Sequence, residues 1–223
     1  MKSILQQRGQ SLLRKLKKVY ARARVPDAFV LWSTPLELVV ATMLSAQCTD
    51  VRVNLVTREL FKKYRTAADY ANAPVAELER AIGSITFFRA KSRYLQGIGR
   101  VLVERFGGEV PRTVEELILL PGVAYKSANL IMAKEFGVQT GVAVDTHVTR
   151  VAVRLGLTKS KNPIAIAADL EALFPRKNWL EVNEYMILHG RAVCRAPRPK
   201  CEECPVRDLC PSARLYLKKK PTK

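Results

Sequence analysis

Apolar residues recur at helical spacing along most of the chain. Between Thr34 and His189 they fall three and four residues apart, which places them on one face of a helix. No stretch shows the strict alternation of apolar and polar residues that is typical of a half-buried strand. The pattern predicts an all-α fold, and its clearest examples are Val75, Leu78 and Ile82, and Val148, Val151 and Leu155.

Helix start and stop signals agree with this pattern. Thr34 with Glu37 forms a predicted capping box with Pro35 at the first helical position, and Thr113 with Glu116 repeats the box. Glycines and prolines end the segments, although two of the glycines lie inside an otherwise helical stretch and weaken the prediction there. We therefore expect many short helices joined by tight turns, with breaks at Gly107-Gly108, Pro111, Pro121-Gly122 and Gly156, while Gly97 and Gly99 lie inside the helical stretch.

The charge of the chain narrows the class of partner. Its 223 residues can form one core or two small ones, and 38 Lys and Arg against 20 Asp and Glu give a net charge of +18. Such a balance is expected of a protein that binds a polyanion, either nucleic acid or a membrane surface. No apolar run approaches the roughly 20 residues needed to span a bilayer. We therefore expect a nucleic-acid partner and no membrane.

The first 26 residues contain no acidic side chain. A transit peptide or a surface-lying helix is the alternative interpretation of such a segment, but it lacks the continuous apolar centre and cleavage site of a signal peptide. We interpret it as a basic helix of the fold, which either contacts DNA or is simply solvated. Its basic residues are Lys2, Arg8, Arg14, Lys15, Lys17, Lys18, Arg22 and Arg24.

Four of the five cysteines are crowded near the C-terminus, and Cys48 stands alone. An odd total favours reduced thiols and metal ligation over disulfides. The spacing is Cys-x6-Cys-x2-Cys-x5-Cys, which can wrap one metal centre. A zinc ribbon normally supplies two CxxC pairs, whereas only one is present here, and four thiolates also suit a 4Fe-4S cluster. Spacing alone leaves both metals open for Cys194, Cys201, Cys204 and Cys210.

Basic residues surround these cysteines, so that closing the loop would present a rigid cationic surface suited to phosphates. They are Arg191, Arg195, Arg198, Lys200 and Arg207.

A second signal is the segment Leu119 to Ala128, in which a helix ends, turns at Pro121-Gly122 and restarts. The free N–H groups of a helix N-terminus bind phosphate without reading bases. Lys126 lies in the first turn of the new helix, where the helix dipole disfavours the ammonium form, and a neutral amine is a nucleophile. A solvated surface charge is the alternative interpretation of Lys126.

Asp145 directly precedes an apolar-periodic helix. It can be a functional carboxylate or an ordinary N-cap. His147 and His189 are expected to be packing or outer-shell residues rather than ligands.

Together these segments resemble the endonuclease III family of DNA glycosylase/AP lyases, the iron-sulfur type of the helix-hairpin-helix superfamily. The resemblance runs from about Pro35 to Cys210. It rests on the cysteine spacing and on four ordered motifs, LSAQCTD at residues 44–50, LPGVAYKSA at 120–128, VDTHV at 144–148 and ILHGR at 187–191.

The resemblance implies a fold and a cofactor. It implies one 4Fe-4S cluster on the four C-terminal cysteines, and a six-helix barrel domain joined to a cluster domain built from both chain ends, with DNA in the cleft between them. The expected cluster domain comprises residues 1–28 and 139–223, with the cluster loop at 194–210. The barrel domain comprises residues 29–138, with the helix-hairpin-helix at about 114–136.

The resemblance also assigns roles to single residues. Lys126 resembles the catalytic amine of the family and Asp145 its partnering carboxylate. Gln47 corresponds to the residue that fills the vacated base stack and Phe87 to the apolar wedge; without the resemblance they would be interpreted as a helix-end polar residue and a buried aromatic. Further DNA contacts are expected at Gly122, Ala124, Tyr125 and Arg191.

Three positions depart from the family pattern. Ala124 and Tyr125 replace a glycine followed by a basic residue, and Thr86 replaces a glycine before the wedge. A Cβ at Ala124 lies where backbone approaches phosphate, Tyr125 removes a charge, and Thr86 restricts the wedge loop. An altered activity or substrate range is therefore part of the expectation.

The implied function is base-excision repair. The expected enzyme is a monomer of the prokaryotic cytoplasm, associated with the nucleoid. It removes oxidised or saturated pyrimidines such as thymine glycol from duplex DNA and cleaves at the abasic site by β-elimination. Two alternatives stay open: a monofunctional mismatch or adenine-type glycosylase, and a DNA-binding member of the family with little catalytic activity.

Overall fold

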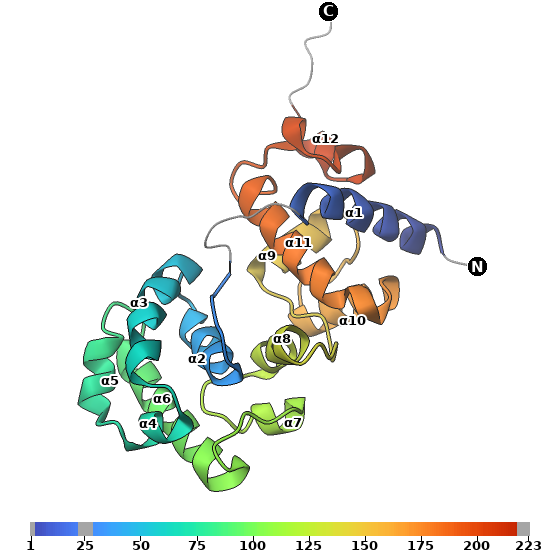
Figure 1. The fold of residues 1–223 in the computed structure, drawn as a ribbon. Coiled ribbons are helices and arrows are strands. Elements are labelled where there is room, and N and C mark those ends of the chain that lie inside the picture. The colour runs from blue at the N-terminus through green and yellow to red at the C-terminus, as the bar shows by residue number, and fades with distance from the viewer. Residues whose placement is uncertain (1–2, 22–28, 218–223) are drawn as a thin grey trace, which may run out of the picture. The chain divides into compact units, whose positions relative to one another are not determined.

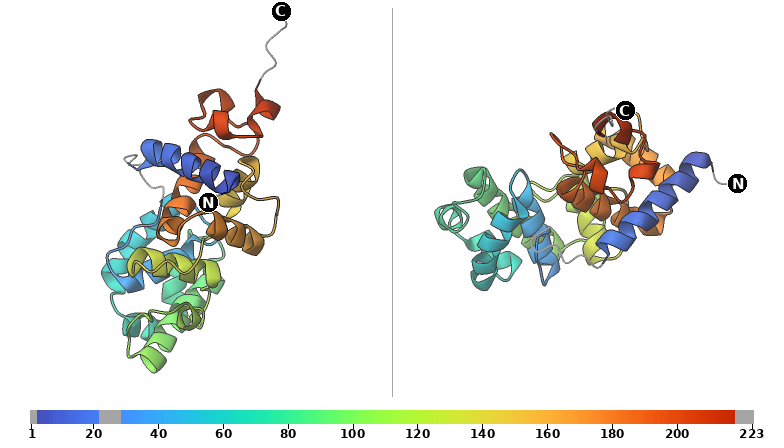
Figure 2. Two further views of the ribbon diagram at one scale, coloured as in Figure 1. Left: turned by 90° about the vertical axis from the view of Figure 1, so that its right-hand side faces the viewer. Right: turned by 90° about the horizontal axis from the view of Figure 1, so that it is seen from above.

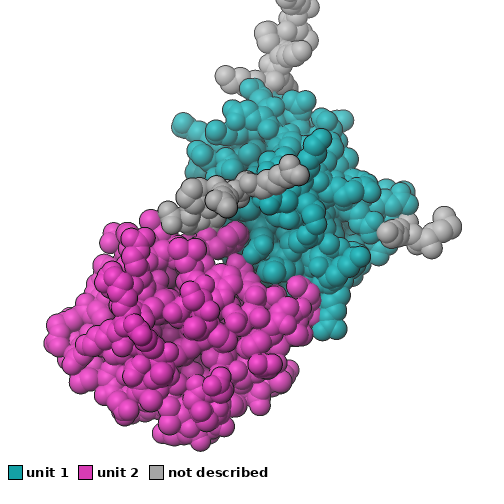
Figure 3. All heavy atoms as spheres, in the orientation of Figure 1, with its two compact units in different colours: residues 1–24, 141–223 teal, residues 25–140 magenta. Residues whose placement is uncertain are grey.

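The chain forms two compact units in a computed structural model that describes residues 3–21 and 29–217 (Figure 1). One unit comprises residues 25–140, and the other comprises residues 1–24 together with 141–223, so that both chain ends belong to it (Figure 3). The expected boundary after residue 28 and the terminal lysines after 217 lie outside the described residues or at their edge.

The described residues form helices and no strands, which confirms the all-α class. In the unit of residues 25–140 these are α2 Pro35–Ser45, α3 Asp50–Lys63, α4 Ala67–Asn72, α5 Val75–Ala81, α6 Phe88–Phe106, α7 Val114–Leu117 and α8 Tyr125–Glu135. In the other unit they are α1 Ile4–Tyr20, α9 Thr146–Arg154, α10 Pro163–Leu173, η1 Arg176–Asn178, α11 Trp179–Ala192, η2 Cys201–Glu203, η3 Arg207–Leu209 and α12 Ala213–Tyr216.

The predicted helix starts are in place, but the two predicted capping boxes are incomplete. The Thr34 and Thr113 side chains each accept the N–H three residues later, as an N-cap does. The carboxylate of Glu37, however, accepts the N–H of Ser33 rather than that of Thr34. Glu116 accepts the hydroxyl of Thr113 instead of its backbone. Complete boxes occur at Ser3 with Gln6 and at Thr66 with Asp69.

Gly97 and Gly99 do not interrupt α6, which continues through both. A Cβ on Gly99 would lie 2.4 Å from the backbone nitrogen of Ala71 and 2.5 Å from the carbonyl oxygen of Ala67, because α4 crosses α6 in close contact. A Cβ on Gly97 would lie 2.9 Å from Cγ of Pro121. The helix predicted through these glycines is therefore confirmed. They let neighbouring backbone approach α6.

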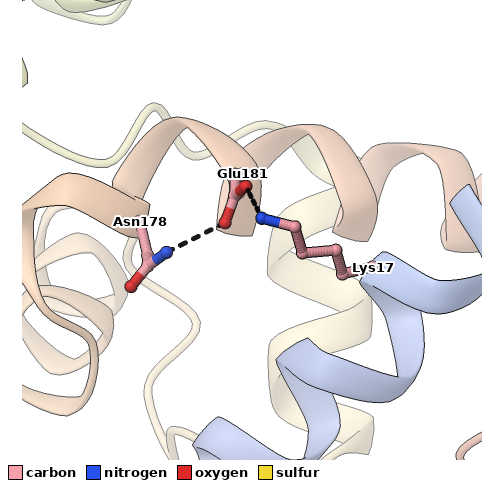
Figure 4. Close-up of polar contacts among 3 residues, drawn as sticks. All are labelled: Lys17, Asn178 and Glu181. Atoms are coloured by element: carbon pink, nitrogen blue, oxygen red, sulfur yellow. Dashed lines mark hydrogen bonds and ion pairs between the residues drawn. The ribbon is translucent and has the colours of Figure 1, made fainter. Parts of the chain in front are cut away.

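In the other unit, α1 packs on α11, and Figure 2 shows the two helices side by side. The apolar face of α1 is buried while its lysines point outward. Lys17 forms an ion pair with Glu181 of α11, and Glu181 also accepts a hydrogen bond from Asn178 (Figure 4). The N-terminal basic segment is thus a helix of the fold across residues 4–20.

Candidate functional site

The turn between α7 and α8 has the geometry expected for a proline followed by a glycine. The N–H of Val123 donates to the carbonyl of Leu120 at 3.1 Å, with Pro121 and Gly122 between them. Gly122 has φ +78°, so this is a type II turn with proline and glycine in their preferred places. A Cβ on Gly122 would lie 2.8 Å from the Tyr94 ring, and the turn therefore tolerates only glycine for two separate reasons.

Helix α8 begins after Ala124 without a side-chain cap. Its first internal backbone bond is donated by Ala128, so the N–H groups of the preceding three residues have no partner within the helix. Ala124 has φ −99°, a conformation that any residue adopts, and its side chain is exposed. Lys126 is exposed in this first turn, and the ring of Tyr125 beside it is 63% exposed. This end of α8 presents backbone donors and an amine to solvent.

Gln47 and Phe87 share an unusual backbone conformation. Among the described residues they are the non-glycine residues with positive φ, at +54° and +58°. Both are exposed, Phe87 at 61%, and the interpretation of Phe87 as a buried aromatic was therefore wrong. Gln47 follows the end of α2, and Phe87 immediately precedes α6. Thr86, by contrast, is not in the left-handed region, so its replacement of glycine causes no strain there.

These two turns belong to the same packed region as the hairpin. Met43 near the end of α2 and Tyr94 near the start of α6 both lie against Gly122, where a Cβ would be 3.0 and 2.8 Å from them. The ends of α2 and α6 that carry Gln47 and Phe87 thus pack against the hairpin that precedes α8, within the unit of residues 25–140. These contacts could not be predicted from the sequence.

Lys91 is buried in the first turn of α6 and bonds to both turns, and sequence reasoning missed it. Its position four residues before Leu95 on a buried stripe was the available signal.

In the other unit, Asp145 is the N-cap of α9. Its Oδ1 accepts the N–H of Val148 at 2.7 Å, as the N-cap interpretation predicts. Among the described residues, Oδ2 of the same carboxylate has no hydrogen-bond partner, and the side chain is partly exposed. One oxygen can therefore hold the helix while the other serves in chemistry.

All four C-terminal cysteines line one pocket with an empty volume of about 360 Å³, part of it open to solvent. Within the described residues, no three His, Cys, Asp or Glu side chains converge on a point that would hold one metal ion. Burial raises the pKa of Cys204 to about 11 and also raises the pKa values of Cys201 and Cys210. A cysteine thiol loses its proton when it binds a metal, and four cysteines that line one pocket fit a thiolate-bound centre.

Donors from outside the cysteine loop point at two of these sulfurs. Nε2 of His189 lies 3.7 Å from Sγ of Cys204, and its Nδ1 lies 3.1 Å from the hydroxyl of Tyr20. His189 is 1% exposed, and burial lowers its pKa to about 4. Arg154 donates to Sγ of Cys194 at 3.5 Å. His189 is thus a buried residue that packs against the cysteine pocket.

Two arginines that sequence reasoning missed hold the loop in place. Arg154 donates to the carbonyls of Arg195 at 2.7 Å and Ala196 at 2.9 Å. Arg8 of α1 donates to the carbonyls of Leu155, Gly156 and Leu209 at 2.7, 2.7 and 3.0 Å. Neither Arg8 nor Arg154 lies in a motif, and their roles depend on tertiary packing.

Arg191, a predicted DNA contact, is exposed in the last turn of α11.

Comparison with known proteins places this geometry in context. Residues 40–176 match the family model described as HhH-GPD superfamily base excision DNA repair protein. Endonuclease III of Synechocystis is 49% identical over 93% of this chain and 93% of its own length. Endonuclease III of Bacillus subtilis is 44% identical over 80% and 81%.

Solved structures of endonuclease III are also similar to this chain. A trapped endonuclease III-DNA covalent intermediate has a TM-score of 0.87 and 39% identity, covering 94% of this chain and 97% of its own. A non-covalent endonuclease III-DNA complex has a TM-score of 0.88 at the same identity, covering 96% and 99%. A thermostable thymine-DNA glycosylase is 22% identical with a TM-score of 0.84 and shares the fold.

Proposed function

Because this chain belongs to the endonuclease III family, within the HhH-GPD superfamily of base-excision DNA repair proteins, it is a DNA glycosylase with AP lyase activity, and we propose that it excises oxidised or saturated pyrimidines. Thymine glycol in duplex DNA is the representative lesion, since its weak stacking eases extrusion from the helix. The observation that carries the proposal is the exposed Lys126 in the uncapped first turn of α8.

Lys126 is the proposed nucleophile. Its neutral amine attacks C1′ of the damaged nucleotide, the glycosidic bond breaks, and the base leaves with the bonding electrons and takes up a proton. The lysine nitrogen then loses a proton and the C1′–O4′ bond of the sugar ring breaks, with O4′ taking up a proton, which gives a protonated Schiff base at C1′. This Schiff base makes the C2′ proton acidic. Removal of that proton expels the 3′ phosphate by β-elimination, and hydrolysis of the Schiff base regenerates the amine. One amine thus serves both the glycosylase and the lyase step.

Asp145 is the proposed carboxylate partner. An ionised Oδ2 stabilises the positive charge that develops on the sugar as the base departs, and it can transfer the protons that the two steps require. The N-cap bond from Val148 to Oδ1 fixes the orientation of the carboxylate. This bond is therefore compatible with the catalytic role.

The DNA contacts follow from exposure and local chemistry. We assign phosphate binding to the backbone at Gly122, Ala124 and Tyr125, because the first N–H groups of α8 have no partner within the helix and a helix N-terminus attracts anions. Gln47 fills the vacated stack, Phe87 wedges the duplex apart, and Arg191 adds a phosphate contact. The net charge of +18 supports a polyanionic partner. Affinity for undamaged duplex is therefore expected to fall steeply with salt.

A 4Fe-4S cluster is the proposed cofactor, held by Cys194, Cys201, Cys204 and Cys210. When bound it cross-links the loop of residues 194–210 and holds the basic side chains of that loop in a fixed arrangement. His189 and Arg154 are suited to hydrogen-bond its thiolate ligands. The test is a brown protein with broad visible absorbance and four irons per chain, whereas one zinc per chain would contradict the assignment.

The cellular setting is also a proposal. None of the helices in the described ranges is long and apolar enough to cross a bilayer. The bacterial endonuclease III relatives support a prokaryotic enzyme. We propose that it acts as a monomer on nucleoid DNA in the cytoplasm.

Borohydride trapping tests the reaction. Wild type is expected to form a covalent adduct with duplexes that contain thymine glycol or an abasic site, and Lys126→Gln is expected to form none. Lys159→Gln, which removes an exposed lysine outside the proposed site, serves as the matched control. If Lys126→Gln traps as efficiently as wild type, Lys126 is not the nucleophile. Excision without trapping by wild type would indicate a monofunctional glycosylase, and binding without either would indicate a DNA-binding protein.

A further inference from the structure

Lys91 is a buried lysine that the proposed reaction does not use. It lies in the first turn of α6 and is 4% exposed. On the same helix face follow Leu95, Ile98 and Leu102, each fully buried. An ammonium group is costly to remove from water, and burial lowers the pKa of Lys91 accordingly. A buried ammonium group is stable only when hydrogen bonds to protein acceptors replace those it made with water.

The ammonium bonds to the end of another helix. Nζ donates to the carbonyl oxygens of Leu44 at 2.8 Å and Ala46 at 2.6 Å. Helix α2 ends here on alanine, without a glycine cap. Its last carbonyls need donors, and a cation is favoured at the negative end of the helix dipole. Lys91 therefore takes the place of a C-cap for α2.

One of the bonded carbonyls, that of Ala46, directly precedes Gln47, whose backbone is left-handed. A non-glycine residue keeps this strained conformation when its surroundings hold it there. The backbone of Lys91 is bonded to the second such residue, since its N–H donates to the carbonyl of Phe87 at 3.1 Å. One residue thus joins both left-handed turns, the first through its side chain and the second through its main chain.

We propose that Lys91 is a positioning residue that holds Gln47 and Phe87 in one preorganised arrangement for insertion into the DNA base stack. This inference rests on the proposed function, which gives the two exposed side chains their role in DNA. Preorganisation matters because a displacement of about 1 Å in a positioning group can slow a reaction by about 10²-fold. Loss of the ammonium would leave two carbonyls without donors and release the turn at Gln47.

A double-mutant cycle tests the inference. The rate constant for single-turnover excision of thymine glycol is measured for wild type, Lys91→Met, Gln47→Ala and the double variant. Lys91→Met is expected to slow excision about tenfold or more in the wild-type background and less than about twofold in the Gln47→Ala background, since coupled residues are non-additive. Equal losses in both backgrounds would show that Lys91 does not act through Gln47 and would overturn the proposal.

Two further measurements separate positioning from general stability. Affinity for undamaged duplex is expected to stay within about twofold of wild type in Lys91→Met, because phosphate contacts dominate it. Hydrogen exchange of the free protein is expected to quicken at residues 46–49 in Lys91→Met and much less at the equivalent end of α3. If Lys91→Met fails to fold, Lys91→Gln carries the same cycle with an intermediate effect, since its amide can still donate to one carbonyl.

The outcomes distinguish the two levels of the proposal. If wild type excises nothing, the proposed function fails, while the exchange measurement still reports whether Lys91 holds the turn. If wild type excises and Gln47→Ala is slow but Lys91→Met matches wild type in rate and exchange, the positioning role fails alone.

Discussion

The carboxylate of Asp145 accepts the backbone N–H of Val148 at 2.7 Å, so the proposed catalytic residue is also the N-cap of α9. The two roles make different demands on the side chain. Capping needs an acceptor oxygen, which can be charged or neutral, whereas stabilising a cationic sugar needs the negative charge of the carboxylate.

Substitutions at Asp145 therefore separate the roles. Asp145→Asn is expected to keep the free energy of unfolding within about 0.5 kcal/mol of wild type, because asparagine caps as well as aspartate. Its excision rate constant is expected to fall by about 10²-fold or more. Asp145→Ala is expected to lose activity similarly and about 1 kcal/mol of stability as well. Urea unfolding and single-turnover excision measure the two quantities.

Asn162→Ala is the matched control, since Asn162 caps α10 through Oδ1. It is expected to lose about 1 kcal/mol and to excise normally. If Asp145→Asn excises at the wild-type rate, the negative charge of Asp145 is not required for the reaction.

Phe87 offers a test of the wedge. Because its ring is 61% exposed, Phe87→Ala is expected to change stability by no more than about 0.5 kcal/mol. Extruding a nucleotide costs a few kcal/mol, and loss of the wedge is expected to slow excision about tenfold or more. Phe87→Leu keeps an apolar side chain and is expected to stay close to wild type. Fluorescence of 2-aminopurine beside the lesion reports extrusion, and an unchanged signal in Phe87→Ala would reject the wedge role.

Tyr125 replaces a basic residue beside the proposed nucleophile. Tyr125→Arg is expected to tighten binding to undamaged duplex and to steepen the slope of log affinity against log salt by about 0.9, as one added phosphate contact would. Val103→Arg adds the same charge at an exposed position on α6 and is expected to leave the slope nearly unchanged. Equal slopes in the two variants would mean that Tyr125 does not face a phosphate.

Gly99 should tolerate no side chain. Gly99→Ala is expected to destabilise the protein by about 3 kcal/mol, because its Cβ would lie 2.4 Å from the backbone of Ala71. Gly83→Ala, whose Cβ would meet nothing closer than 3.3 Å, is expected to change stability by less than about 1 kcal/mol. Urea unfolding compares the two. Similar losses would contradict the close crossing of α4 and α6.

The capping box at Asp69 predicts a pH dependence. Backbone donors, Thr66 N–H first and then Arg65 N–H, both at 2.8 Å, lower the pKa of Asp69. A carboxylate with a lowered folded-state pKa adds stability above its unfolded pKa of about 3.9, and that stability is lost as pH falls through the folded pKa.

Wild type should therefore lose more stability than Asp69→Asn on acidification from pH 5 to below the folded pKa of Asp69, by no more than about 0.5 kcal/mol because the carboxylate is exposed and screened by solvent. Thermal unfolding at a series of pH values measures the difference. Glu104→Gln, exposed on α6, is expected to track wild type. Parallel pH curves for wild type and Asp69→Asn would rule out the contribution.

The sequence by itself determined the helical class, the hairpin and the candidate residues for chemistry. It could do so because these are local properties: three- and four-residue apolar spacing, a proline and glycine in consecutive turn positions, and cysteines close enough in the chain to close one loop. Asp145 was recognisable as a cap for the same reason. The five ordered motifs added the family.

Tertiary structure decided what distant segments do to one another. Gly99 allows α4 to cross α6 in close contact, and nothing in its neighbouring residues indicates this. Phe87 could not be recognised as exposed and left-handed, because neither property follows from its neighbours in the chain. Arg8, Arg154 and Lys91 donate to carbonyls 41 or more residues away, and a backbone acceptor leaves no trace in the sequence. A charged group can be buried only where hydrogen-bond acceptors surround it, and the positions of these acceptors are set by the tertiary fold.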